Sequence, residues 1–203
     1  MRRLVIVPNP RFSVPAVLVA VAGWLVVPGA AFAQQPAPAP SIQPRYLVQI
    51  EAELRAMHLS PQCAAASAQA GTCTLRTSAA AASGLPQTSD ARGWILSIQY
   101  DDNSDTIYLS IDHYGVIRSD NAGLAATTRR LLEANWEMLT AHFEWSSATG
   151  ELRLSSVINT DSNFDRRAFR GVVRSLLRLA DRYADEVARL TRQPVGVVPP
   201  TTP

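Results

Sequence analysis

The 203-residue chain contains no lysine, and all 19 of its basic side chains are arginine. Its three histidines stand apart at positions 58, 113 and 142, without the HxxxH or HExxH spacing of a zinc site. The GxSxG, GxGxxG and P-loop motifs are also missing. The sequence therefore predicts no metal, no cofactor and no enzymatic activity.

The longest apolar run, residues 14–27, is shorter than the roughly 20 residues needed to span a bilayer. Three arginines at positions 2, 3 and 11 precede it, and Ala31-Phe32-Ala33 follows as a small-x-small cleavage pattern. This arrangement predicts a secretory signal peptide over residues 1–33, cleaved after Ala33, with an uncleaved anchor as the alternative. We expect a periplasmic or secreted protein with no membrane span after cleavage.

A surplus of positive charge is also lacking once the signal is removed. The three arginines of residues 1–33 leave with it, so 16 cations remain against 17 acids, a net charge of −1. Binding to nucleic acid depends on a surplus of basic groups that neutralise phosphates. A nearly neutral domain is therefore not expected to bind nucleic acid.

Cysteine is scarce, with one pair at Cys63 and Cys73. An even number of cysteines in an exported chain favours a disulfide over free thiols. Metal binding is a further alternative, but it would require two more ligands, and the nearest histidine, His58, has no companion.

Proline marks the limits of the domain. Residues 34–44, "QQPAPAPSIQP", predict an extended linker, and residues 192–203 predict a disordered tail. The intervening residues 45–191 have a common length for a single domain.

Hydrophobic periodicity predicts helices and hairpins within this domain. Apolar residues recur at helical spacing in 44–58, in 119–139 and from about 162 to 190, and they alternate in the hairpins 94–112 and 139–158. Residues 72–78 predict a short strand and residues 79–93 a mobile loop. We expect Asp120 or Asn121 to cap the second helix, and Ser162 with Asp165 to cap the third.

Each hairpin has a single apolar face. The inner positions of the second hairpin are Leu139, Ala141, Phe143, Trp145, Leu152 and Leu154, with Val157 out of phase, as at a bulge. The second helix is expected to bury Leu124, Thr128, Leu131, Leu132, Asn135 and Met138. The pattern predicts an α+β fold in which helices pack on one side of an antiparallel sheet.

The last helix places arginines at positions 166, 170, 174, 178 and 182, opposite its apolar stripe. Acids three or four residues away predict intrahelical pairs for Arg178, Arg182 and Arg189. The first turns, with Arg166, Arg167, Arg170 and Arg174, lack acidic partners in the sequence apart from Asp165. A solvated face is the favoured interpretation, and a docking surface for an acidic partner or an anion site are the alternatives.

The second half of the domain is similar to the YbjN family of bacterial sensory-transduction regulators. The similarity lies in a helix with "LLEANWEML", a hairpin "HFEWSSATGELRLSS" and a helix ending "LLRLADRYADEV", and it extends more loosely over residues 45–190. The resemblance implies a fold like that of type III secretion chaperones, which commonly pair into dimers. It also implies a non-enzymatic module that binds proteins.

We therefore expect an exported adaptor, chaperone-like or regulatory module that binds a protein or peptide and pairs into a homodimer. Its expected binding surface is the open face of the sheet, with Tyr108, His142 and Glu144, or an exposed sheet edge, followed by the arginines of the last helix. The alternative is a carrier of a small ligand or lipid, with Trp94, Phe143 and Trp145 lining an apolar cavity.

Overall fold

The computed structural model describes residues 43–86, 92–161 and 163–192. The predicted signal peptide, most of the predicted linker, Ser162 and nearly all of the predicted tail lie outside these ranges. The elements follow one another as α1 (Leu47–Ala56), β1 (Gln62–Ala65), β2 (Ala70–Thr77), α2 (Ala79–Ala82), β3 (Trp94–Asp101), β4 (Thr106–Val116), α3 (Leu124–Glu137), β5 (His142–Trp145), β6 (Glu151–Asn159) and α4 (Arg166–Thr191).

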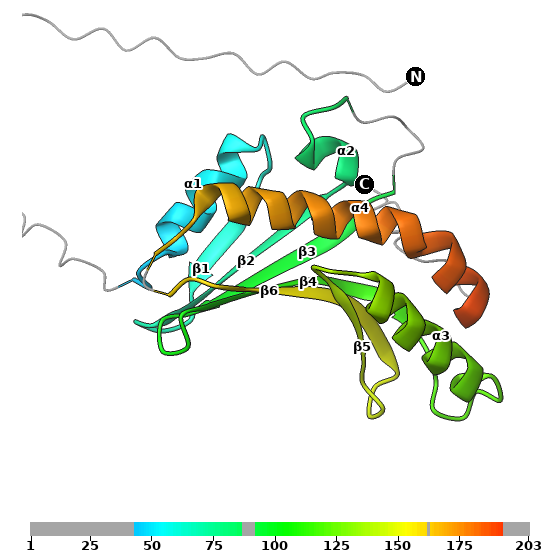
Figure 1. The fold of residues 1–203 in the computed structure, drawn as a ribbon. Coiled ribbons are helices and arrows are strands. Elements are labelled where there is room, and N and C mark those ends of the chain that lie inside the picture. Colours follow the sequence, from blue (N-terminus) through cyan, green and yellow to red (C-terminus); the bar gives the residue numbers. More distant parts are fainter. Residues whose placement is uncertain (1–42, 87–91, 162, 193–203) are drawn as a thin grey trace, which may run out of the picture. The chain divides into compact units, whose positions relative to one another are not determined.

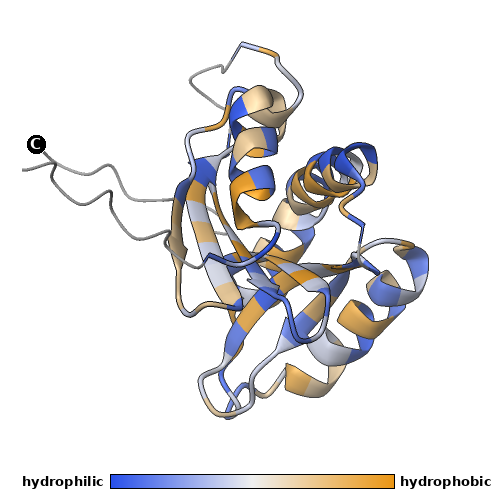
Figure 2. Ribbon diagram, turned by 90° about the vertical axis from the view of Figure 1, so that its left-hand side faces the viewer, coloured by the Kyte–Doolittle hydropathy of each residue, from blue (hydrophilic) through white to orange (hydrophobic). Residues whose placement is uncertain are grey.

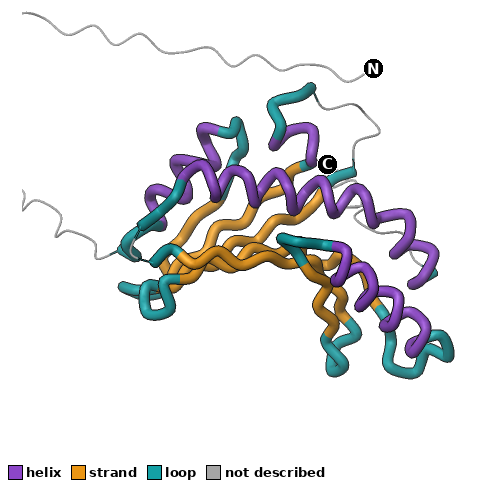
Figure 3. Tube along the Cα trace, viewed as in Figure 1, coloured by secondary structure: helices purple, strands orange, loops and turns teal. Residues whose placement is uncertain are grey.

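The strands form one antiparallel sheet in the order β1-β2-β3-β4-β6-β5. Helices α1, α2 and α4 cover one face of this sheet, and α3 lies beside β5 (Figures 1 and 3). The predicted α+β class, with an antiparallel sheet packed against helices, is confirmed. Within the described ranges, no helix is both long and apolar enough to cross a membrane.

The core lies between the sheet and α4. Hydrophobic and hydrophilic residues alternate along the strands (Figure 2), which puts Leu96, Ile98, Leu109 and Leu154 on the buried face. The opposing stripe of α4 is also buried, and it comprises Phe169, Val173, Leu176, Leu177, Ala180, Tyr183, Ala184 and Val187. Burial of these side chains on both surfaces is the main stabilising contribution to the fold.

A bulge interrupts β4 and aims an aromatic side chain at the core. The pairing with β6 shifts between Ile111 and Gly115, where His113 adopts a φ of 53°. The shift turns Tyr114 inward, where its hydroxyl donates to the Ala180 carbonyl of α4 at 2.6 Å. The irregularity expected at Val157 therefore lies in β4, whereas Val157 pairs in register with Tyr108 and is exposed on the open face.

Two short elements, β1 and α2, were not predicted from the sequence. The segment between the cysteines folds back as the hairpin β1–β2, in which Cys63 and Cys73 are directly paired and joined by a disulfide. The region expected to be a loop over residues 79–93 begins with α2, which Ser78 caps by accepting a hydrogen bond from the Ala81 amide. Residues 87–91 of that region lie outside the described ranges.

The helix starts differ in part from expectation. Asp165 is itself the N-cap of α4, because its carboxylate accepts hydrogen bonds from the amides of Arg167 and Ala168. The predicted capping pair placed Asp165 three residues after Ser162, which lies outside the described residues. Neither Asp120 nor Asn121 caps α3; instead, Asn121 accepts from the Gly123 amide, one residue before the helix.

The disulfide predicts a measurable contribution to stability. It closes a loop with a sequence separation of 10 residues, and in the chain-entropy model such a loop contributes about 2–3 kcal/mol. We expect the double variant C63A/C73A to lose about this much free energy of unfolding in urea titrations. Wild-type protein unfolded in reductant serves as the control and should lose the same amount, while the double variant should not respond to reductant. Equal stability of oxidised wild type and variant would contradict the prediction.

Candidate functional site

A cluster of polar side chains occupies the open face of the sheet, around Glu144 of β5. The Tyr108 hydroxyl donates a hydrogen bond to Glu144 Oε2 at 2.6 Å, and Arg153 Nε donates one to the same oxygen at 2.8 Å. Ser155 Oγ donates to Oε1 at 2.7 Å, and His142 Nε2 lies 3.0 Å from Oε1. The predicted open-face residues Tyr108, His142 and Glu144 thus lie together, but their polar groups are bonded to one another.

These bonds change the acidity of the cluster. Burial raises the pKa of Glu144, but the hydrogen bonds from Tyr108, Ser155 and Arg153 outweigh burial and lower that pKa to about 2. Burial, together with the hydrogen bond to Glu144, raises the pKa of Tyr108 to about 12. The carboxylate is therefore ionised and the phenol neutral across the physiological range.

The cluster also contains a serine beside a histidine, a pair that the sequence did not reveal. Ser155 pairs with His142 across β5 and β6, and its Oγ lies 3.1 Å from His142 Nε2. A catalytic relay requires the serine and the carboxylate to contact opposite ring nitrogens. Here both contact Nε2, and Ser155 is fully buried. The arrangement is that of a satisfied polar network and not of an activated nucleophile.

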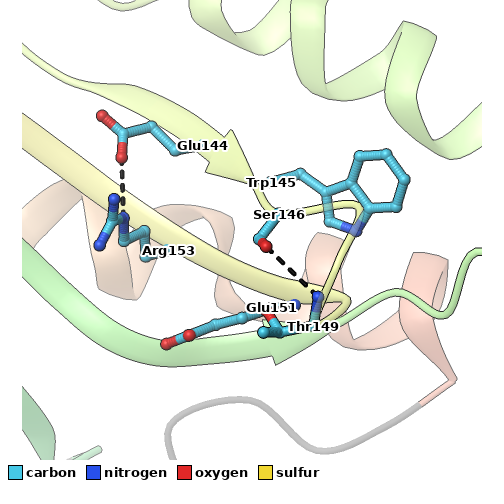
Figure 4. Close-up of a pocket in the computed structure, with 6 residues that line it drawn as sticks. All are labelled: Glu144, Trp145, Ser146, Thr149, Glu151 and Arg153. Atoms are coloured by element: carbon cyan, nitrogen blue, oxygen red, sulfur yellow. Dashed lines mark hydrogen bonds and ion pairs between the residues drawn. The ribbon is translucent and has the colours of Figure 1, made fainter.

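A polar hollow of about 400 Å3 adjoins this cluster (Figure 4). Its lining residues are Glu144, Trp145, Ser146, Thr149, Glu151 and Arg153. Glu144 and Arg153 form an ion pair with each other at 2.8 Å, and Glu151 lies 3.4 Å from His113 Nδ1. No group of three or more histidine, cysteine, aspartate or glutamate side chains suited to a metal occurs in the described part of the chain.

The arginines of the first turns of α4 have a partner that the sequence did not reveal. Glu53 of α1, whose side chain is 7% exposed, forms ion pairs with Arg166 Nε at 3.5 Å and Arg170 Nε at 3.0 Å. Arg174 donates to the Ala82 carbonyl at the end of α2. Two of the four arginines therefore have an acidic partner on another helix, which the helix sequence alone did not reveal, and Arg174 binds a backbone carbonyl of α2. Among the ion pairs of the described residues, Arg167 has none.

The acids of α4 also reach other elements and not their helical neighbours. Glu186 binds Arg130 of α3 at 2.5 Å, Asp185 binds Arg92, and Asp181 accepts from the Trp94 indole at 2.7 Å. The intrahelical pairs predicted for Arg178, Arg182 and Arg189 do not occur among the ion pairs of the described residues. Through these ion pairs and this hydrogen bond, the acids link α4 to α3 and to the beginning of β3.

Three exposed apolar side chains lie in the second half of α3 and just after its end. Leu132, Trp136 and Leu139, which we name the α3 patch, are 68%, 91% and 99% exposed, respectively. The sequence analysis placed Leu132 and Leu139 in the core, and it assigned no role to Trp136. Leu131 and Met138 are buried as predicted, but the other buried residues of the helix are Thr127 and Ala134. The sequence signal for the patch was a tryptophan one turn from Leu132 and outside the predicted inner face.

An apolar hollow of about 190 Å3 is lined by residues of α3 and of the β5–β6 hairpin. Leu132 borders both this hollow and the α3 patch, and the full lining comprises Thr128, Leu131, Leu132, Asn135, Phe143, Trp145 and Leu152.

The Asn135 side chain occupies backbone hydrogen-bonding groups in the middle of the edge strand β5. The Asn135 side chain accepts from the Phe143 amide at 2.6 Å and donates to the Phe143 carbonyl at 3.1 Å. These are the two backbone groups of Phe143 that an added strand would use. Asn135 therefore blocks extension of the sheet at this point of β5.

The comparisons with known proteins add little to this geometry. No protein-family model matches the chain, and no curated protein matches it. Among solved structures, it is similar to a chain in the crystal structure of the ExsC-ExsE complex, with 20% identity and a TM-score of 0.34. This similarity covers 51% of the present chain and 84% of the other. At this TM-score it carries no argument about function.

The Glu53 ion pairs predict a specific sensitivity. In R166Q/R170Q the buried Glu53 carboxylate would lose both partners, and we expect the free energy of unfolding to fall by roughly 2–3 kcal/mol. The matched control R167Q/R178Q also removes two charges from α4, and it should change stability by less than about 0.5 kcal/mol. Adding E53L to R166Q/R170Q should recover most of the loss. Equal effects of the two arginine pairs in urea titrations would show that Glu53 is not stabilised by them.

The low pKa of Glu144 predicts acid sensitivity. Because this pKa lies below its ordinary value of 4.5, the stabilisation is complete above about pH 4.5 and is lost as pH falls towards 2. We expect E144Q to remove about 1–2 kcal/mol at pH 7, discounted for partial exposure, and to flatten stability between pH 4.5 and 2. Urea titrations across that range measure the difference, and parallel pH profiles for wild type and E144Q would contradict it.

Proposed function

We propose that the protein is an exported, non-enzymatic module that binds another polypeptide, with the α3 patch as its docking surface. The observation that carries this proposal is the exposure of Trp136 and Leu139, which stand almost entirely in water. Extended apolar patches on soluble proteins usually mark interaction sites. Tryptophan is also among the residues that contribute most strongly to protein interfaces.

This location revises the docking surface expected from the sequence. Tyr108, His142 and Glu144 satisfy one another on the open face, and Arg166, Arg170 and Arg174 bind α1 and α2. A partner would have to break these bonds to use the same polar groups. Docking on the α3 patch breaks no internal hydrogen bond of Leu132, Trp136 or Leu139 and removes apolar surface from water.

Export and family membership are parts of the same proposal. The N-terminal sequence pattern supports a signal peptide cleaved after Ala33, and the Cys63–Cys73 disulfide fits a periplasmic or extracellular location. The pattern of residues 45–190 supports a relationship to the YbjN family. A regulatory or chaperone-like role and a homodimer would follow from that relationship.

The carrier alternative receives less support. Trp94 is buried and stacks on Tyr114 with ring centroids 5.1 Å apart, so it packs the core. Phe143 and Trp145 line the hollow beside α3, but its 190 Å3 falls below the roughly 300 Å3 typical of small-ligand sites. This hollow is suited to a single large side chain of a protein partner.

The proposal predicts that partner capture depends on the α3 patch. Affinity capture from envelope extract with the exported chain should recover a specific polypeptide, and W136S/L139S should reduce its recovery at least tenfold. The control V157S removes a valine that is 49% exposed on the open face, and it should capture the same polypeptide as wild type. Both variants should unfold within about 0.5 kcal/mol of wild type, since the replaced side chains are exposed.

Two outcomes would contradict this assignment. Equal recovery by wild type and W136S/L139S would place the docking surface elsewhere. Recovery of a lipid or small molecule in place of a polypeptide would favour the carrier.

A further inference from the structure

We propose that the outer face of α4 attaches the protein to the anionic phospholipid surface of a membrane. Four exposed arginines on this face, which we name the outer arginines, would make the contact: Arg167, Arg178, Arg182 and Arg189. They are distinct from the arginines that bind Glu53 and the end of α2. This inference goes beyond the docking of a polypeptide on the α3 patch and does not depend on it.

The outer arginines lie along one side of the helix. With 3.6 residues per turn, their four positions fall within about 60° of one another around the axis, opposite the buried stripe that packs on the sheet. Arg167 and Arg189 are 22 residues apart in the sequence, which corresponds to about 33 Å along the helix. Helix α4 lies across the sheet on the helical side of the molecule (Figure 1). A flat surface could therefore contact all four guanidinium groups at the same time.

The positive charge of this face is not neutralised by the described part of the chain. Among the ion pairs and side-chain hydrogen bonds of the described residues, none involves the guanidinium group of an outer arginine. The three acids that are close to them in the sequence bind Arg92, Trp94 and Arg130 instead. Arg178 and Arg182 also lie four residues apart, a spacing at which like charges on a helix repel each other. The fold thus concentrates positive charge on one face, although the net charge without residues 1–33 is −1.

The chemistry of the face matches phosphate headgroups. A guanidinium group donates two parallel hydrogen bonds to phosphate oxygens, and it stays charged throughout the physiological pH range. Anionic phospholipids give a membrane a negative surface potential that attracts clusters of basic side chains. Because this attraction falls off within about 8 Å at physiological ionic strength, it acts on side chains that approach the surface together. The arrangement of the outer arginines on one side of a helix meets that requirement.

An acidic polypeptide is the competing partner, and the surface of α4 favours it less. Tight protein interfaces depend on apolar or aromatic side chains that become buried at their centre. The large hydrophobic residues that are exposed in the described part of the chain lie on other elements, and none belongs to α4. Gly171, which lies between the first two outer arginines, adds no side chain and borders open space. A cationic face without an apolar anchor is suited to electrostatic attachment at the headgroups, without insertion among the acyl chains.

Co-sedimentation of the exported chain with phospholipid vesicles tests the inference. We expect binding to vesicles of phosphatidylcholine that contain about one third phosphatidylglycerol, and none to vesicles of phosphatidylcholine alone. Sodium chloride at about 0.5 M should release the bound chain, because it screens surface charges. The variant R167Q/R178Q/R182Q/R189Q should have a partition coefficient at least tenfold lower than that of wild type. Its urea midpoint should be no lower than that of wild type, since the replaced side chains are exposed.

A matched pair of variants separates the position of the charges from their number. R167Q/R178Q removes two outer arginines, whereas R76Q/R118Q removes two exposed arginines from β2 and from the segment after β4. Both variants lower the net charge equally, but only R167Q/R178Q should weaken binding to the anionic vesicles, by at least threefold. Equal weakening by the two variants would overturn the assignment to α4.

Several results would overturn the membrane contact while leaving the α3 patch as a docking surface. They are no binding to anionic vesicles, equal binding to neutral vesicles, and binding that survives replacement of all four outer arginines. Capture of an acidic polypeptide through the outer arginines, without vesicle binding, would replace the membrane by a protein partner.

The polypeptide-docking proposal is tested separately. W136S/L139S should bind vesicles as wild type does, and R167Q/R178Q/R182Q/R189Q should capture the same polypeptide as wild type. Loss of vesicle binding in W136S/L139S would assign the membrane contact to the α3 patch and overturn the role of α4.

Discussion

The fold depends on the burial of one face of the sheet beneath α4. This helix has 26 residues, and its apolar stripe lies against β4 and β6. Two hydrogen bonds set its position, from the Tyr114 hydroxyl to the Ala180 carbonyl and from the Trp94 indole to Asp181. Because these polar groups are satisfied at the boundary of the core, the apolar surfaces can meet without leaving a buried donor unpaired.

The burial of the apolar stripe of α4 also determines where the charged side chains of this helix lie. With its apolar stripe against the sheet, α4 places its arginines and acids along the margins of the interface, where they meet neighbouring elements. Glu53 of α1 binds the arginines at one end, and Arg130 of α3 binds Glu186 near the other. The row of arginines is thus neither a free anion site nor wholly a solvated face. Part of it attaches the smaller helices to the core.

Elements in which hydrophobic residues recur with one clear period could be predicted from the sequence. Helix α4 and the hairpin β3–β4 are the clearest cases. The orientation of α3 could not, because leucines at 124, 131, 132 and 139 leave two overlapping apolar faces. Packing against β5 selects the face with Leu131 and Met138. The strand β1 lacks alternation, and Glu53 and the His142–Ser155 pair find their partners only through tertiary contacts. One-dimensional patterns do not encode such neighbours.

The end of the sheet at which α3 adjoins the edge strand β5 has two features that bear on function. An unprotected strand edge promotes unwanted association, and here the Asn135 amide closes that edge at Phe143. The adjoining helix nevertheless holds a tryptophan and a leucine almost fully in water. Leu131 and Met138 already supply the core contacts of α3, so Trp136 and Leu139 add nothing to burial within the chain. The proposed docking contact would cover them, and it would be made through side chains and not through backbone pairing.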